Sequence, residues 1–109
     1  MPQPDINALV TVTQATDIST GVTCHARHGQ ITTQAMTAAA AGEHAFIVTN
    51  NRVSAGSIIV AHINTTASAG TPIIWVNTVG AGVFTINITN VHATVALDNT
   101  AIISFLVLK

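Results

Sequence analysis

Residues 83–89 alternate between apolar and polar side chains, and this pattern constrains the fold more than any other feature of the chain. In an extended strand the three apolar side chains of this segment share one face and the three polar ones share the other: Phe84, Ile86 and Ile88 against Thr85, Asn87 and Thr89. A period of two is typical of a β-strand with one buried face. The segment therefore predicts a sheet that covers a hydrophobic core.

Residues 102–108 predict a second strand, which is apolar on nearly every position. In a strand with one solvated face, apolar and polar residues would alternate, so we expect this strand to be buried on both sides. The second side would be covered inside the domain or by a neighbouring subunit. Phe105 and Val107 join Phe84, Ile86 and Ile88 in the predicted core.

Six further segments are rich in β-branched residues, which favour strands. They are Ala8 to Thr13, Val22 to Ala26, Gln30 to Thr33, His44 to Thr49, Ser57 to Asn64 and Pro72 to Thr78. Asn, Gly and Pro clusters separate them and supply turns. Gln34 to Gly42 lacks a helix cap and an amphipathic stripe, so we read it as a loop crossing between strands. The chain is predicted to be all-β: a single antiparallel β-sandwich of about eight strands, with a jelly-roll topology.

Charged residues are scarce. Only 6% of the 109 residues are charged, three basic and four acidic, while 49% are hydrophobic. A folded chain of this mass exposes roughly 5,700 Å², which leaves about one charge per 800 Å², against about one per 200 Å² on an ordinary domain. Either Thr and Asn solvate the surface, or identical copies and a larger assembly cover much of it. We favour the second explanation, which predicts a homo-oligomer.

The composition also argues against several functions. Arg27, Arg52 and Lys109 are the only basic residues apart from histidine, too few for a nucleic-acid-binding face. No apolar run is long enough for a transmembrane helix, and residues 1–5 lack the pattern of a signal peptide. Cys24 is the single cysteine, so the chain can form no internal disulfide. We expect neither nucleic acid nor membrane as a partner.

The segment Cys24-His25-Ala26-Arg27-His28 holds the densest group of possible metal ligands. On an extended strand Cys24 and His25 point to opposite faces, as do His25 and His28. A structural zinc site needs four convergent ligands, and His44, His62 and His92 are isolated in the sequence. We predict no metal site and no cofactor, although a trimer axis could gather three copies of one histidine. Cys24 is interpreted as a buried small hydrophobe rather than a nucleophile.

No catalytic motif is present, so an enzyme is not expected. The acids Asp5, Asp17, Glu43 and Asp98 are far apart in sequence, and we interpret Glu43 as a solvated carboxylate and Asp98 as a turn cap. Gly80-Ala81-Gly82 lacks the strand-to-helix context of a phosphate loop and reads as a turn. Trp75 has apolar neighbours on both sides, which favours a position in the core or a subunit interface. An exposed Trp75 would instead favour stacking on a sugar.

The second half of the chain holds a series of strand and turn segments: Phe46-Ile47-Val48-Thr49-Asn50, Val53, Ser57-Ile58-Ile59-Val60, Gly70-Thr71-Pro72, residues 82–91, Leu97 and residues 103–107. This series resembles the small jelly-roll cement, decoration and head-fibre proteins of tailed bacteriophage virions. The pattern, from Phe46 to the C-terminus, spans more than half of the chain, but it consists of strands and turns and contains no catalytic signature. The resemblance implies a homo-oligomer, most often a trimer, seated on a shell of major capsid protein.

These expectations define a viral structural protein of the virion, located on the capsid surface, that stabilises or decorates a bacteriophage capsid. The alternative is a receptor- or carbohydrate-binding module of a virion appendage. Residues 18–109 would form the sandwich, and residues 1–17 would be either a capsid-contacting arm or the first strand. Pro2 and Pro4 disfavour regular structure at the start of that segment.

Overall fold

The computed structural model describes residues 8–39, 42–66 and 70–108, which form ten strands and no helix. The strands are β1 (Leu9–Thr13), β2 (Val22–Thr23), β3 (His28–Thr32), β4 (Met36–Ala38), β5 (Glu43–Thr49), β6 (Ile58–Thr66), β7 (Pro72–Gly80), β8 (Val83–Asn90), β9 (Leu97–Asn99) and β10 (Ala101–Leu108). The predicted all-β sandwich is confirmed.

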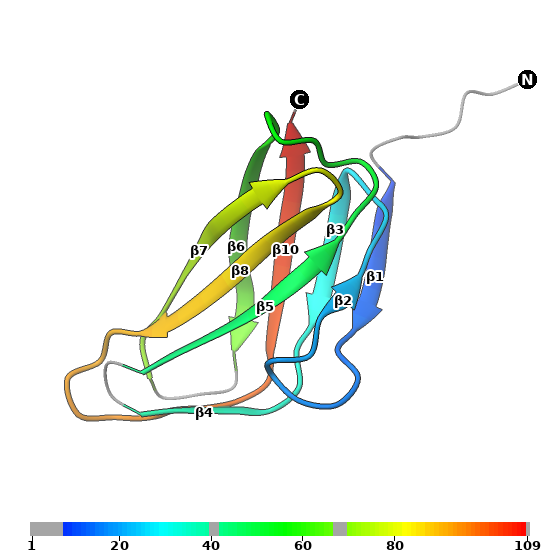
Figure 1. Ribbon diagram of the computed structural model, residues 1–109. Coiled ribbons are helices and arrows are strands. Elements are labelled where there is room, and N and C mark those ends of the chain that lie inside the picture. The colour runs from blue at the N-terminus through cyan, green and yellow to red at the C-terminus, as the bar shows by residue number, and fades with distance from the viewer. Residues whose placement is uncertain (1–7, 40–41, 67–69, 109) are drawn as a thin grey trace, which may run out of the picture.

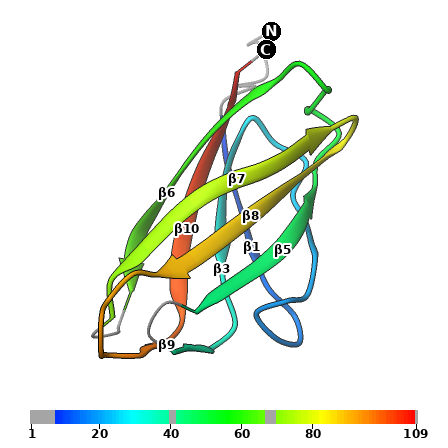
Figure 2. The same ribbon diagram turned by 60° about the vertical axis from the view of Figure 1, so that its left-hand side comes forward.

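Two four-stranded sheets form the sandwich. Sheet A has the strand order β1-β3-β10-β6 and sheet B has the order β2-β5-β8-β7. The strands of sheet B cross those of sheet A obliquely (Figures 1 and 2). The short strands β4 and β9 pair with each other at one end of the sandwich.

Each sheet contains one parallel pair, which corrects the prediction of a wholly antiparallel sandwich. β1 runs parallel to β3, and β2 runs parallel to β5. Parallel strands need a long crossover connection, and here each connection contains a strand of the other sheet. β2 of sheet B lies between β1 and β3 in the chain, and β3 of sheet A lies between β2 and β5. The structure does not confirm the jelly-roll topology, which stays a prediction.

Two segments differ from their predicted structure. Residues 34–42, expected to be a loop, contain β4, whose three residues pair with β9. The strand predicted over residues 22–26 ends at Thr23, although the Cys24 amide still donates to the carbonyl of Thr49 over 2.9 Å.

The predicted turn at Gly80-Ala81-Gly82 is confirmed. It joins β7 to β8, and Gly82 adopts a φ of 78°, which glycine tolerates best.

The core lies between the sheets and contains all five residues predicted for it: Phe84, Ile86, Ile88, Phe105 and Val107. Phe84 of sheet B and Phe105 of sheet A meet edge to face, with ring centroids 5.2 Å apart. The Phe105 ring also lies against Gly29 of the neighbouring strand β3, where a Cβ atom would come within 2.3 Å of two ring carbons. Glycine at position 29 therefore makes room for the ring that joins the two sheets.

β1 forms the edge of sheet A beside β3, with Leu9 opposite His28 and Thr13 opposite Thr32. The predicted arm begins outside the described residues, because residues 1–7 are not among them. The choice between an arm and a first strand is therefore resolved in the structure only for residues 9–13, which are a strand.

Candidate functional site

The outer face of sheet A carries a group of exposed aliphatic side chains, which we call the apolar face. It consists of Leu9, Ile58, Val60, Leu106 and Leu108, which are between 37% and 62% exposed. Strand register brings them together, since Leu106 lies opposite Val60 and Leu108 opposite Ile58. Alternation along β10 turns Phe105 and Val107 into the core and Leu106 and Leu108 outward.

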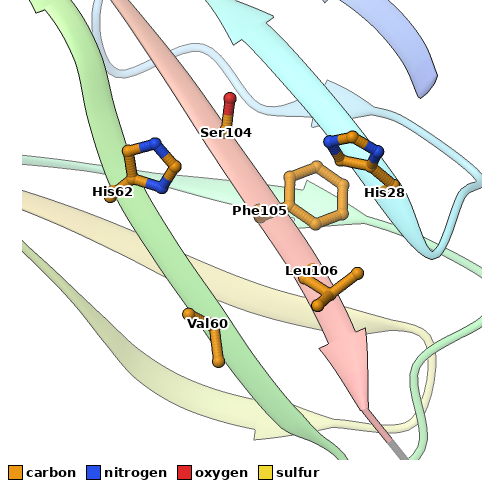
Figure 3. Close-up of a pocket in the computed structure, with 6 residues that line it drawn as sticks. All are labelled: His28, Val60, His62, Ser104, Phe105 and Leu106. Carbon is orange, nitrogen blue, oxygen red and sulfur yellow. The ribbon is translucent and has the colours of Figure 1, made fainter.

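A shallow depression of about 210 Å³ adjoins this face. It is lined by His28, Val60, His62, Ser104, Phe105 and Leu106, and Figure 3 shows the two imidazoles on either side of β10. His28 lies opposite Leu106, and His62 lies opposite Ser104. His62 is isolated in the sequence, and only the register of β3, β10 and β6 shows that it lies on the same face as His28.

The two imidazoles lack the further ligands that a metal site requires. Among the described residues, no three His, Cys, Asp or Glu side chains form a group that could hold a metal ion. Ser104, between them, accepts a hydrogen bond of 3.4 Å from Nε2 of Gln30. The depression is therefore a mostly apolar hollow with a histidine on each side.

Cys24 and His25 point in opposite directions, as predicted. The Cys24 side chain is buried, with Sγ 3.8 Å from the carbonyl oxygen of Val10. Burial raises the pKa of the Cys24 thiol, because a thiolate would lose its hydration. His25 is exposed, and its Nδ1 accepts a hydrogen bond from the Asn51 amide over 3.0 Å. This arrangement gives the thiol neither an activating base nor a stabilised thiolate.

His44 and His92 bind the backbone near loops. Nε2 of His44 lies 3.2 Å from the Thr37 carbonyl oxygen. Nδ1 of His92 accepts hydrogen bonds from the amides of Thr94 and Val95, over 3.1 and 2.9 Å. Both imidazoles therefore have local structural roles.

The outer face of sheet B carries a polar group that the sequence did not reveal, which we call the Trp75 cluster. It consists of Trp75, Glu43, Asn87 and Thr89, from three adjacent strands. The Thr89 hydroxyl donates to Oε2 of Glu43 over 2.8 Å, and Nδ2 of Asn87 donates to Oε1 over 3.2 Å. Nε1 of Trp75 donates to the Thr89 hydroxyl oxygen over 3.4 Å. A hydrogen-bonded chain thus connects the indole to the carboxylate.

The structure bears on two interpretations of single residues. Trp75 lies outside the core of the chain and is 42% exposed, because alternation along β7 turns Ile74 and Val76 inward; its place in a subunit interface stays a prediction. Glu43 is exposed but has two protein hydrogen-bond donors, so it is more than a solvated carboxylate. Glu43 is more than forty positions from Asn87 and Thr89 in the sequence. Only the pairing of β5 with β8 shows that the three residues lie side by side.

Among the remaining acids, the structure describes the side chain of Asp17. Oδ1 of Asp17 accepts hydrogen bonds from the Ser19 amide and the Thr20 hydroxyl, over 2.8 and 3.2 Å, and so closes a turn. Asp5 and the side chain of Asp98 lie outside what the structure describes.

Comparison of the chain with protein-family models, with curated proteins and with solved structures found no match. Within the described residues, no helix has the length and apolarity to cross a bilayer.

Proposed function

We propose that this protein is a structural component of a bacteriophage virion: a cement or decoration protein that assembles as a homo-oligomer on the capsid surface. The observation that carries the proposal is the apolar face of sheet A. Five exposed aliphatic side chains lie together on a chain with only 6% charged residues. Such a face lowers the free energy of the system when another apolar surface covers it.

The apolar face is the proposed contact between subunits, with a trimer favoured. Its side chains carry no charge, so copies can pack against one another about a symmetry axis without burying an unpaired ion. His28 lies within this face, between Leu9 and Leu106, and would be covered by the contact, whereas His62 lies opposite Ser104 at its border. The major capsid protein is the proposed second partner, which the assembled sandwich would bind by its remaining surface or by residues 1–7.

Leu106→Glu tests the subunit contact. We expect native mass spectrometry at micromolar concentration to show an oligomer for the unmodified protein and a monomer for Leu106→Glu, because burying a carboxylate among the aliphatic side chains of the contact is strongly unfavourable. Ile47→Glu is the matched control: Ile47 is 53% exposed on the outer face of sheet B, and its substitution should leave the oligomer intact. A monomeric unmodified protein would contradict the proposal.

Capsid binding requires its own experiment. Purified capsids of the virus that encodes the chain should co-sediment with the protein, and saturation should occur at a fixed ratio to the major capsid protein. An oligomer that stays in the supernatant at all concentrations would refute the decoration role while leaving the subunit contact intact.

The second candidate function, a receptor- or carbohydrate-binding module of a virion appendage, is favoured by one observation. Trp75 is exposed on the outer face of sheet B beside the Glu43 carboxylate. A single protein can perform both functions, because the apolar face and the Trp75 cluster lie on opposite sides of the sandwich.

A further inference from the structure

The Trp75 indole lies along the surface of sheet B. Its Nε1 donates to Thr89 on the adjacent strand β8, and Thr89 is directly opposite Ile73 rather than Trp75. To reach that hydroxyl, the ring must extend across the strand pair and cannot stand upright. With 42% of the residue exposed, an apolar surface remains open to solvent. A flat aromatic surface of this kind stacks against the C–H face of a sugar ring.

The Glu43 carboxylate is held in a fixed position. Asn87 and Thr89 each donate to one of its oxygens, and each oxygen keeps capacity for a further hydrogen bond. Hydrogen bonds to an ionised carboxylate are stronger than those between neutral groups. An exposed carboxylate that is already oriented can therefore accept bonds from neighbouring hydroxyls without losing much side-chain entropy.

Asn87 supplies an independent observation. The residue is only 4% exposed, and its Oδ1 has no hydrogen-bond partner among the described residues. Its amide nitrogen must face Glu43, because an ionised carboxylate accepts hydrogen bonds and cannot donate them. Buried acceptors without a partner are rare, and each calls for an explanation such as an ordered water beside it.

We propose that the Trp75 cluster is a binding site for a neutral oligosaccharide. Trp75 stacks on one sugar ring, and Glu43 accepts hydrogen bonds from hydroxyls of the next. Nε1 of Trp75 lies 3.4 Å from the Thr89 hydroxyl oxygen, which lies 2.8 Å from Oε2 of Glu43. The carboxylate is therefore close enough to the indole to accept hydrogen bonds from a ring linked to the stacked one. Glu43 is the single charged residue of the cluster and would repel an acidic sugar.

This inference goes beyond the capsid role and gives the second candidate function a site and a ligand class. The protein itself provides the readout, because Trp75 is its only tryptophan and tyrosine is absent. We would titrate the unmodified protein with cellohexaose, maltohexaose, chitohexaose and mannohexaose and record intrinsic fluorescence. At least one should give a saturable change, with a Kd in the millimolar range or below.

Two variants test the named roles by isothermal titration calorimetry. Trp75→Ala should abolish binding, and Glu43→Gln, which keeps the size of the side chain, should weaken it by about tenfold or more. Gly56→Ala, in the loop before β6 where an added Cβ meets no heavy atom within 4 Å, is the control and should bind as the unmodified protein does. Circular dichroism establishes that each variant keeps the β-sandwich.

The proposal is overturned if none of the four sugars gives a saturable signal at about 10 mM, or if Glu43→Gln binds with unchanged affinity. It is also overturned if native mass spectrometry shows that Trp75→Ala turns an oligomer into a monomer. The face would then be a contact between copies of the chain. None of these results bears on capsid co-sedimentation, so the two proposals fail separately.

Discussion

At the scale of single residues, buried amides connect loops to the central strands of sheet B. Nδ2 of Asn50 donates to the Ala26 carbonyl over 2.6 Å, and its Oδ1 accepts from the Ala26 amide over 3.2 Å. Nδ2 of Asn90 donates to the Val95 carbonyl over 2.8 Å. Asn50 directly follows β5 and Asn90 is the last residue of β8; because the two strands are antiparallel, the asparagines lie at opposite ends of the sheet. A neutral amide satisfies buried backbone groups without the desolvation cost of a charge.

Cys24 leads to a prediction about pH. Burial raises the pKa of its thiol in the folded state above the unfolded value of about 8.5. Above that value the unfolded chain releases the thiol proton while the folded chain retains it, so the free energy of unfolding falls as pH rises. The contribution is complete below pH ~8.5 and declines from there up to the folded pKa. Urea unfolding from pH 7 to 10 should show this decline, and Cys24→Ala should reduce it. An identical pH dependence in the variant would contradict the assignment.

At the scale of strands, the sequence predicted the elements that alternate or are strongly apolar. β8 was predicted with its core residues because Phe84, Ile86 and Ile88 recur at every second position. β10 was predicted because residues 102–108 are apolar at nearly every position. β4 and β9 were missed because three residues are too few to establish a period. The parallel pairs were missed because strand direction depends on which connections cross between sheets, and local pattern carries no information about that.

Gly29→Ala tests the contact between β3 and β10. A Cβ at position 29 would overlap the Phe105 ring and approach Sγ of Cys24 to 2.9 Å. We expect the substitution to lower the free energy of unfolding by about 1–3 kcal/mol, the usual cost of overpacking, as measured by urea denaturation. Gly56→Ala is the control, since no heavy atom lies within 4 Å of its added Cβ. In the Gly29→Ala/Phe105→Leu double variant the smaller side chain should reduce the penalty. An additive loss would show that the ring is not responsible.

At the scale of the whole molecule, the outer face of sheet A is aliphatic, whereas that of sheet B combines exposed Ile47 and Ile73 with the Trp75 cluster. The sequence predicted that segment 102–108 is buried on both sides; within one chain its outer side is exposed, so cover by a neighbouring subunit stays a prediction. The Trp75 cluster was not foreseen, since it combines Glu43 of β5, Asn87 and Thr89 of β8 and Trp75 of β7. Its geometry depends on the register of three strands, which the sequence leaves undetermined.

Deleting residues 1–7 tests the proposed arm. If they contact the capsid, for example by adding a strand to an exposed edge of a neighbour, the truncated protein should lose co-sedimentation with capsids. Its oligomeric mass should stay unchanged, because the apolar face lies within residues 9–108. Decoration of capsids by the truncated protein with unchanged affinity would show that the arm is not required.

The position of β10 has a consequence for biosynthesis. It is the last of the described strands to leave the ribosome, yet it lies between β3 and β6 in sheet A. Until it emerges, both neighbours lack the partner that separates them, and unpaired strand edges invite pairing with other chains. Sheet A therefore closes only after β10 has emerged, and chaperone protection of the nascent chain would be most valuable before that point.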